Sequence, residues 1–316
     1  MRVFVTGGSG FIGSNLVDAL VSLGHDVVVY DNLSTGRVEF LSSCRDKIEL
    51  VEADILDLDR LKHAMSGCDM VIHLAANADV RGGLSNPYRD LDQNTLGTHN
   101  VLESMRANGV NRIAFSSTSS VYGEATQIPT PETESFPIQT SLYGASKLAG
   151  EALIQAYCEG YGFRGWIFRF VSIVGPRYTH GHIYDFVEKL RDTPDRLEIL
   201  GNGLQRKSYL HVADCVSGIL CAIERAEQKV NIFNIAHTES CTVLQSAGWI
   251  SEELGLQPTM QVGESERGWV GDNPVIVLDA SRLESLGWKP STGLEEGIRS
   301  TVSWLNENRW VFKDVR

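Results

Sequence analysis

Tyr143 and Lys147 stand four positions apart in the segment Tyr143-Gly-Ala-Ser-Lys147, which opens a stretch with a helical pattern. Residues at positions i and i+4 lie on the same face of a helix, so we expect the phenol and the ammonium group to lie close together. A phenol with a pKa of about 10 is a poor base at neutral pH, but a neighbouring cation favours the phenolate. The pair therefore predicts a general base, with an ordinary surface pair as the alternative.

A glycine-rich turn, Thr6-Gly7-Gly8-Ser9-Gly10-Phe11-Ile12-Gly13, joins the first predicted strand to the first predicted helix. It fits G-x-G-x-x-G from Gly8 and G-x-x-G-x-x-G from Gly7. With either spacing, the bare backbone can approach a pyrophosphate at the helix N-terminus. A tight structural turn is the alternative. The strand before the turn and the helix after it favour a dinucleotide site.

Asp31 ends the second predicted strand, where a carboxylate accepts hydrogen bonds from both ribose hydroxyls and repels the 2′-phosphate of NADP. NAD is therefore favoured, although the nearby Arg37 could soften that preference. The positive nicotinamide ring would join Lys147 in favouring the phenolate, and a shift of about three pKa units requires roughly 4 kcal/mol. Asp54 and Ile55, after the third predicted strand, are expected to flank the adenine, but Asp54 is also placed to cap the next helix.

A run of hydroxyl side chains, Ser116-Ser117-Thr118-Ser119-Ser120, ends the predicted strand that precedes Tyr143. The carboxyl ends of parallel strands are where ligands collect. We expect Thr118 to supply a hydroxyl that bridges a substrate oxygen and Tyr143. Ser116 and Ser117 are expected to face the backbone or the cofactor.

Short apolar segments alternate with helical patterns through the first half of the chain. The predicted strands are 3–5, 26–30, 48–51, 70–74 and 112–116, and the predicted helices are 11–23, 58–66, 87–108 and 142–160. Strands that are apolar throughout and alternate with helices form a parallel sheet covered on both faces. The sequence therefore predicts an α/β fold, a Rossmann-type doubly wound parallel sheet with right-handed crossovers.

The pattern changes after Arg169, where glycines and prolines mark a loop-rich region. Residues 209–212 and 230–235 are predicted strands that return to the sheet. An amphipathic closing helix is predicted by the spacing of Leu294, Ile298, Val302 and Leu305.

No internal repeat, low-complexity segment or long linker separates independent domains. We expect two lobes instead: a cofactor-binding domain and a smaller, discontinuous α/β C-terminal substrate lobe. Their predicted bounds are 1–171 plus about 208–238 for the first, and about 172–207 plus 239–316 for the second.

The composition limits the partners. The chain has 316 residues and a formal net charge of −12, and a surface that acidic repels nucleic acid and anionic membranes. None of the six cysteines forms C-x-x-C, and His180-x-His182 lacks a third ligand, so no metal site is predicted. The chain has no apolar run of about 20 residues and no signal-peptide pattern, which predicts a soluble, cytoplasmic protein.

Five motifs together resemble the extended short-chain dehydrogenase/reductase family, and within it the UDP-glucose (UDP-galactose) 4-epimerase branch. They are Thr-Gly-Gly-x-Gly-Phe-Ile-Gly at 6–13, Asp31-Asn-Leu-Ser-Thr-Gly36, His73-Leu-Ala-Ala76, Asn94-Thr-x-Gly-Thr-x-Asn100 and Tyr143-x-x-x-Lys147. The likeness runs nearly end to end and includes the segments 180–186, 205–209 and 267–272.

The resemblance implies that NAD stays bound through turnover. Tyr143 takes the proton of the sugar 4-hydroxyl while hydride passes to the nicotinamide, and hydride later returns to the other face of the 4-keto sugar. Lys147 would hold the nicotinamide ribose and Thr118 the shared proton path. The cofactor-binding residues predicted from the motifs and the resemblance together are Gly7, Gly10, Phe11, Ile12, Gly13, Asp31, Asn32, Ser34, Thr35, Gly36, Asp54, Ile55, Leu74, Ala75, Ala76, Asn94, Ser116, Tyr143, Lys147 and Phe170.

On the substrate side, the resemblance implies a sugar-nucleotide diphosphate held by local positive charge. Arg206 and Lys207 are the candidates, with an ordinary solvated pair as the alternative. In better-known epimerases a single arginine stands where Lys207 falls here. Arg267 and Asp272 are expected to contact phosphate and ribose respectively.

Four further residues are assigned to the substrate by the resemblance. Leu200 and Ile183 are expected to face the uracil. Ser172 stands where many epimerases carry a substrate-binding asparagine, so its shorter hydroxyl needs water to reach the diphosphate. Ile276 stands where a large tyrosine limits the C2 substituent in some relatives, which predicts that N-acetylated sugars fit.

Several other activities stay open. Relatives that are 4,6-dehydratases carry Asp-Glu directly after the catalytic threonine, and decarboxylases of UDP-glucuronate carry a glutamate two positions after it. Here Ser119 and Ser120 follow Thr118, so both activities are disfavoured, whereas a UDP-glucuronate 4-epimerase remains possible. An NAD-binding regulatory protein would be expected to lack Tyr143 or Lys147, and both are present.

Assembly is predicted from the same resemblance. The helical segments 87–108 and 142–160 are similar to those that pair into a four-helix dimer interface in this family. We therefore expect a homodimer.

Overall fold

The computed structural model describes residues 1–80, 82–134 and 138–312, and the chain divides into two compact units. The first consists of Met1–Gly123, Pro137–Arg169 and Ile219–Phe233, and the second of Glu124–Phe136, Phe170–Gly218 and Asn234–Arg316. Helix α7 (Val212–Arg225) and strand β11 (Val230–Ile235) each contribute to both units. The assignment of the lobes to a cofactor and a sugar nucleotide stays a prediction.

A seven-stranded sheet with the order β11-β6-β5-β4-β1-β2-β3 forms the centre of the first unit. Besides β11, its strands are β1 (Arg2–Thr6), β2 (Asp26–Asp31), β3 (Ile48–Glu52), β4 (Met70–His73), β5 (Arg112–Thr118) and β6 (Arg164–Phe170). Parallel pairing joins β3, β2, β1, β4 and β5, in that order. The predicted doubly wound α/β fold is confirmed. Strand β6 is absent from the prediction because glycine and arginine interrupt its apolar run.

The register of the sheet brings the ends of four strands together. Thr6 lies opposite Tyr30 on one side and His73 on the other, and His73 lies opposite Phe115. The segments that follow β1, β2, β4 and β5 therefore leave the sheet at one edge. Ligands of parallel α/β sheets bind at this carboxyl edge.

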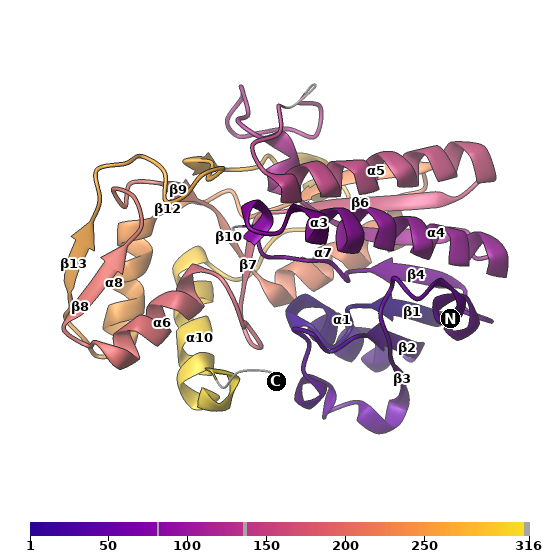
Figure 1. Ribbon diagram of the computed structural model, residues 1–316, viewed down its shortest axis with the longest axis horizontal. Helices are drawn as coiled ribbons and strands as arrows, with labels where there is room; N and C mark the ends of the chain where they lie inside the picture. The colour runs from indigo at the N-terminus through magenta and orange to yellow at the C-terminus, as the bar shows by residue number, and fades with distance from the viewer. Residues whose placement is uncertain (81, 135–137, 313–316) are drawn as a thin grey trace. The chain divides into compact units, whose positions relative to one another are not determined.

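Helices cover both faces of the sheet because alternate strand residues point to opposite sides. Phe4 and Phe115 belong to the core beneath α4 (Gly97–Asn108) and α5 (Leu142–Tyr161), which run side by side (Figure 1). Val29 points the other way, toward Val17 of α1 (Phe11–Ser22). Burying each such apolar side chain contributes about 1.5–3 kcal/mol. The shorter helices of this unit are α2 (Leu58–Ala64), η1 (Val38–Leu41), η2 (Arg45–Lys47), η3 (Gly82–Leu84) and η5 (Ser119–Tyr122).

The segment predicted as one helix over 87–108 has three parts. Helix α3 (Pro87–Asp90) leads into η4 (Leu91–Leu96), a π-helix, and η4 continues into α4. A π-turn holds one residue more than an α-turn and is common at functional sites. Asn94 lies in this wide turn, and its side chain is engaged on three sides by other segments.

The second unit contains three small sheets, with the orders β10-β7, β12-β9-β14 and β13-β8. The strand predicted over 209–212 does not return to the large sheet: β10 (Tyr209–His211) pairs with β7 (Ser172–Val174) instead. The predicted return of 230–235 is confirmed by β11. The remaining elements are α6 (His182–Asp192), β8 (Arg196–Ile199), β9 (Arg206–Lys207), β12 (Cys241–Thr242), α8 (Val243–Glu253), β13 (Thr259–Val262), β14 (Val275–Ile276), α9 (Ser281–Glu284), α10 (Leu294–Glu307) and η6 (Arg309–Phe312).

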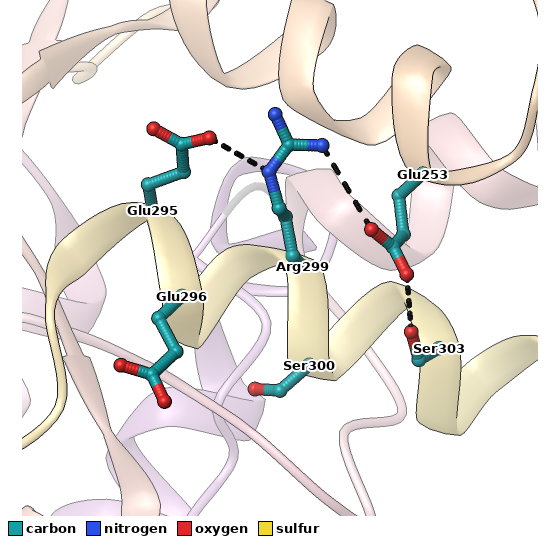
Figure 2. A pocket seen from close by; sticks show the side chains of 6 residues that line it. All are labelled: Glu253, Glu295, Glu296, Arg299, Ser300 and Ser303. Carbon is teal, nitrogen blue, oxygen red and sulfur yellow. Dashed lines mark hydrogen bonds and ion pairs between the residues drawn. The ribbon is translucent and has the colours of Figure 1, made fainter.

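Arg299 ties α10 to α8 in the second unit. Its Nε donates to Glu295 on its own helix at 2.7 Å, and its other nitrogens lie 2.6 Å from Glu252 and 3.8 Å from Glu253. An open cleft of about 390 Å³ lies beside this cluster (Figure 2). The predicted closing helix is thus present as α10, with Ile298, Val302 and Leu305 fully buried.

No helix in the described parts of the chain is both long and apolar enough to span a lipid bilayer.

Glu151 of α5 should be a large contributor to stability. Its carboxylate is fully buried, binds Arg169 at 2.7 and 3.0 Å, and accepts from the Ser117 hydroxyl. Breaking a buried pair leaves an uncompensated charge, so Glu151→Gln should lower the free energy of unfolding by about 3–5 kcal/mol. Glu159→Gln is the control, because Glu159 lies on the same helix but its ion pair with Lys229 is exposed, so its loss should cost at most about 1 kcal/mol. Urea denaturation measures both; equal losses would contradict this account.

Candidate active site

Helix α5 positions the tyrosine and the lysine. The Ser141 side chain caps the helix by accepting from the Gly144 N–H at 3.0 Å, so α5 begins at Leu142. Tyr143 and Lys147 therefore lie one turn apart on one face, as expected from their spacing. Lys147 is almost completely buried, whereas part of Tyr143 is exposed.

Burial opposes the charge that each of these groups needs. Burial raises the pKa of Tyr143 to about 12. The Asp90 carboxylate raises this pKa further, whereas a hydrogen bond with Thr118 lowers it. Burial lowers the pKa of Lys147 to about 7, which Glu151 partly offsets. The protein alone thus favours the phenol, and the expectation that Lys147 and the nicotinamide ring together favour the phenolate stays a prediction. Reaching a pKa of 7 from 12 requires about 7 kcal/mol of added stabilisation.

The surroundings of Lys147 hold it in place. Its Nζ lies 4.3 Å from the centre of the Phe115 ring, within cation–π range. The Glu151–Arg169 ion pair lies one turn further along α5. Lys147 is therefore fixed between a ring and a buried carboxylate rather than moving freely in solvent.

Thr118 and its neighbours end β5 at the carboxyl edge. The Thr118 Oγ1 accepts from the Ser120 N–H at 3.1 Å and is hydrogen-bonded with the Tyr143 phenol. Ser116 donates to the His73 carbonyl at 3.2 Å, and Ser117 donates to Glu151. The structure therefore brings Thr118, and not the two serines, to the reactive phenol.

His73 connects the end of β1 to the first turn of α4. Its Nδ1 lies 2.7 Å from the Thr6 hydroxyl and its Nε2 lies 3.0 Å from the Thr98 hydroxyl. Because Thr98 donates its own proton to the Asn94 carbonyl at 2.6 Å, we infer that His73 carries its proton on Nε2. Burial, with a smaller effect of Lys147, lowers the pKa of His73 to about 3, so the ring is neutral.

The glycine turn is shaped by close backbone approaches. Gly7 has a φ of +69°, and a Cβ there would lie 2.7 Å from the Ala75 nitrogen. A Cβ on Gly13 would fall on the Gly7 carbonyl oxygen. No side chain caps the start of α1 at Gly10, so the positive end of this helix is available to an anion.

Asp31 is buried beside this turn. Its carboxylate accepts from the Ser9 N–H and the Leu33 N–H, both at 2.9 Å, and burial raises its pKa. Gly36 packs against the same carboxylate: a Cβ there would lie 2.9 Å from Oδ1. Asp31 therefore fixes the turn, and its role at the ribose stays a prediction.

Asn32 and Asp54 are joined, with the Asn32 side chain donating to Asp54 at 2.8 Å. Asn32 also accepts from the Ser34 N–H at 3.0 Å. The alternative role for Asp54 as a helix cap is wrong, because Asp57 caps α2 by accepting from the Arg60 N–H. Asp54 instead accepts from the Leu56 N–H at 2.9 Å, two residues away.

Asn94 links the loop after β4 to α5. Its amide nitrogen donates to Ser146 at 2.9 Å and to the Asn77 carbonyl at 3.2 Å, and its oxygen accepts from the Asn77 N–H at 2.8 Å. Ser146 in turn donates to the Tyr143 carbonyl at 2.8 Å. The predicted cofactor residues Leu74, Ala75 and Ala76 lie in this loop.

These features fit a bound dinucleotide. The turn excludes side chains where a pyrophosphate must approach the backbone, an uncapped helix end follows it, and a buried carboxylate ends the next strand. Among the described residues there is no group of three or more potential metal ligands.

Three of the predicted substrate residues lie together in the second unit. The Lys207 ammonium donates to the Asp272 carboxylate at 2.7 Å and to the Asn273 carbonyl, and Arg267 donates to the Asp272 carbonyl at 3.2 Å. Burial lowers the pKa of Lys207, and Asp272 opposes that change. The Lys207 charge is thus largely engaged within the protein.

The other predicted substrate residues differ in exposure. Ile276 on β14 lies opposite Lys207 on β9, and Ser172 on β7 is exposed. Leu200 is 44% exposed, whereas Ile183 on α6 is fully buried. The exposed Arg206 donates to Ser240 at 2.9 Å, and Phe170 is buried at the end of β6.

Two further residues belong to these groups without a signal in the sequence: His182 lies in the second unit and Asp90 lies near Tyr143. The His182 Nε2 is hydrogen-bonded with the Ser246 hydroxyl at 2.7 Å, and its ring centre lies 4.9 Å from that of Tyr209. Burial lowers the pKa of His182 to about 3. Asp90 lies close enough to Tyr143 for its charge to act on the phenol. No spacing rule finds either residue, because both contacts arise from tertiary packing.

The comparisons with known proteins agree with this site. Residues 3–236 match the model of the NAD dependent epimerase/dehydratase family. The chain belongs to the NAD-dependent epimerase/dehydratase family. It is 36% identical to a putative UDP-glucose 4-epimerase of Methanocaldococcus jannaschii, over 97% of this chain and 99% of that protein.

Solved structures of other family members are also similar. The crystal structure of a UDP-galactose 4-epimerase superposes with a TM-score of 0.88 at 40% identity, covering 98% of this chain and 100% of the other. A double mutant of the dTDP-glucose 4,6-dehydratase DesIV of Streptomyces venezuelae, with NAD bound, gives a TM-score of 0.91 at 27% identity, covering 98% of each chain. This family member is therefore an NAD-dependent enzyme, and relatives of both reaction types share its fold.

Gly13→Ala should disrupt the cofactor turn of this family member. The added methyl group collides with the Gly7 carbonyl, so the turn must open and the affinity for NAD should fall at least about tenfold, or about 1.4 kcal/mol. Gly248→Ala in α8 is the control, because nothing lies within 4 Å of its added Cβ. Calorimetric titration of cofactor-stripped protein measures the affinity. Unchanged binding by the Gly13 variant would refute this geometry.

Proposed function

We propose that this enzyme is a 4-epimerase of a nucleotide-linked hexose, interconverting UDP-glucose and UDP-galactose or their N-acetylated analogues. The observation that carries the proposal is the pairing of Tyr143 with Thr118 beside a buried Lys147, with no carboxyl side chain at the two positions after Thr118. The likeness to 4-epimerases over almost the whole chain supports the same activity.

Proton transfer is assigned to Tyr143. The phenolate accepts the proton of the sugar 4-hydroxyl and returns it to the same oxygen after the 4-keto sugar has presented its other face. Thr118, hydrogen-bonded with the phenol, keeps that proton near the sugar oxygen during the interval. Bound NAD would supply the chemistry that the side chains lack, which is reversible hydride acceptance at C4.

Lys147 assists through its charge. Held under the Phe115 ring and beside Glu151, it stabilises the phenolate and binds the nicotinamide ribose. The phenolate would in return favour the ammonium form of Lys147, because a nearby negative charge raises the pKa of an ammonium group. The roles of the predicted cofactor residues, from Gly7 to Phe170, are part of this proposal.

The two residues after Thr118 favour epimerisation over dehydration. A 4,6-dehydratase must also remove the C5 proton and protonate the group leaving C6, which requires an acid and a base. Ser119 and Ser120 stand at the positions where those relatives carry Asp-Glu, and a serine hydroxyl is neither acid nor base near neutral pH. An epimerase needs only the tyrosine and a cofactor that returns the hydride.

The second unit is proposed to bind the nucleotide. Arg206 is exposed and Arg267 is partly exposed and paired with Glu124, so a diphosphate reaching Arg267 would replace that carboxylate, whereas the buried Lys207 is committed to Asp272. Lys207 therefore acts by holding the Asp272 segment, and Ile276 beside it on the β9–β14 pair leaves room for a C2 N-acetyl group.

A homodimer is proposed from exposed apolar side chains on the helices expected to form the interface. Leu84 is 68% and Tyr88 64% exposed, and Leu91, Leu96 and Leu142 are exposed as well. They follow one another along η3, α3, η4 and the start of α5. A second copy of the chain, packing its own helices there, would cover them.

The product distinguishes the reactions. Purified enzyme incubated with UDP-glucose, UDP-galactose, UDP-N-acetylglucosamine, UDP-glucuronate and dTDP-glucose should convert at least one UDP-hexose without change of mass, as resolved by chromatography and mass spectrometry. Loss of water or carbon dioxide would replace the epimerase by a dehydratase or a decarboxylase. Failure with UDP-N-acetylglucosamine alone, beside good UDP-glucose turnover, would remove the role of Ile276.

Tyr143→Phe should lower kcat by about 10²–10⁴, because the only assigned proton acceptor is lost. Tyr161→Phe is the matched control: this tyrosine ends the same helix, is exposed, and should leave kcat unchanged. Steady-state rates with the UDP-hexose identified above measure both. Undiminished turnover by the Tyr143 variant would end the proposed mechanism.

Light scattering at micromolar concentration should give twice the chain mass of 34.8 kDa. Tyr88→Glu places a charge in the proposed interface and should shift the mass toward that of one chain. Leu204→Glu, at a residue 62% exposed in the second unit, should remain dimeric. A monomeric wild-type protein would contradict the assignment.

A further inference from the structure

Asp90 is a buried carboxylate that the proposed mechanism does not use. It ends α3 and is 1% exposed. Its Oδ1 accepts from the Asn77 side chain at 2.8 Å and from the Asn94 side chain at 3.3 Å. Its Oδ2 is buried and has no hydrogen-bond partner within the described residues. An unsatisfied, buried carboxylate oxygen is costly, so its presence calls for a reason.

The surroundings of Oδ2 are shaped to admit it. A Cβ on Gly83 would lie 2.8 Å from this oxygen, so the bare backbone of η3 packs against it. The same Cβ would lie 3.5 Å from the Leu142 side chain, next to Tyr143. The carboxylate thus lies where η3, α3 and the first turn of α5 meet.

Asp90 also anchors the loop that follows β4. The Asn77 side chain donates to Asp90, while the Asn77 backbone exchanges two hydrogen bonds with the Asn94 side chain. Asn94 extends the same connection to Ser146 on α5. One carboxylate oxygen therefore helps to fix both the loop with the predicted cofactor residues and the helix with the base.

Among the residues that the structure describes, few charged groups act on Asp90. Arg89 from α3 favours its ionised form, Asp79 from the loop opposes it, and burial raises its pKa. From α5, Tyr143 is the titratable group on which Asp90 acts, and Lys147 lies one turn further on. Because Asp90 is buried, its field at the phenol is screened much less than that of a surface acid.

We propose that Asp90 is a positioning residue of this reaction: it clamps the loop after β4 through Asn77 and places a negative charge beside the Tyr143 phenol. The charge makes the phenolate less stable, so Tyr143 keeps its proton until cations in the loaded site offset that charge. This inference rests on the proposed role of Tyr143 as the base.

Asp90→Asn separates the charge from the clamp. The amide has the shape of the carboxylate, and its oxygen still accepts from Asn77. Loss of the charge stabilises the phenolate, so the acid limb of the kcat profile should move to lower pH by about one unit. Asp79→Asn is the control, because Asp79 is exposed on the same loop and its removal should leave the limb within experimental error. Superimposable profiles for the Asp90 variant and the wild type, or an equal shift in the control, would overturn the charge role.

Asn77→Ala tests the clamp and does not depend on the stability of the Asp90 variant. Without the donor to Asp90, the loop loosens, and the NAD content of the purified protein should fall at least twofold while the acid limb stays in place. Full NAD retention would overturn the clamp. Cofactor content is measured on denatured protein and needs no substrate.

A wrong assignment of the reaction can be told apart from a wrong role of Asp90. If the wild type converts no UDP-hexose, the acid limb is measured on reduction of the bound NAD, followed by absorbance, with whichever sugar nucleotide reduces it. A wild type that forms a dehydration product would change the reaction assigned above, and the shift between wild type and Asp90→Asn would still decide the role of Asp90.

Discussion

Burial of the Tyr143 phenol is the constraint on which the proposed site depends. A phenol removed from water holds its proton, and burial raises the pKa of Tyr143 to about 12, so the side chain without a ligand is a neutral phenol near neutral pH. Lys147 is subject to the same burial, which acts against its charge. The two groups become a functional pair only when opposite charges are brought together in a site of low polarity. Ligand binding and base formation are therefore coupled by electrostatics.

The scaffold around the two groups is built largely from neutral hydrogen bonds. His73 is uncharged and joins Thr6 to Thr98, and Asn94 joins the loop after β4 to Ser146. The one strong ion pair of the region, within the described residues, is Glu151 with Arg169, which lies one turn beyond Lys147. Asp90 is the charged member of the network: its carboxylate accepts from Asn77 and Asn94, and its field acts against the phenolate near the start of α5.

Much of the fold could be predicted from sequence because it depends on local patterns. Apolar strands alternating with helices indicate the parallel sheet, and the glycine turn and Asp31 follow from strand-end chemistry. Strand β6 and the pairing of β10 with β7 could not be predicted from sequence. The partner of a short strand depends on which strand edges are unpaired in the folded protein, and local sequence does not show this. The engagement of Lys207 with Asp272 joins residues 65 positions apart, and the contact of Asp90 with the tyrosine depends on packing between helices. Such contacts leave no periodic signal.

The wide turn of η4 has a consequence for how this segment tolerates change. Six residues from Leu91 to Leu96 are wound with one more residue per turn than an α-helix allows. Because the wide turn takes up the extra residue, deleting a single residue there would restore regular winding while the segments on either side kept nearly the same orientation. The change would fall on the side chains inside the turn, so Asn94 would no longer point at the loop after β4 as it does now. The extra residue thus acts locally: the count of residues in the turn sets the direction of Asn94 without rotating the helix that follows.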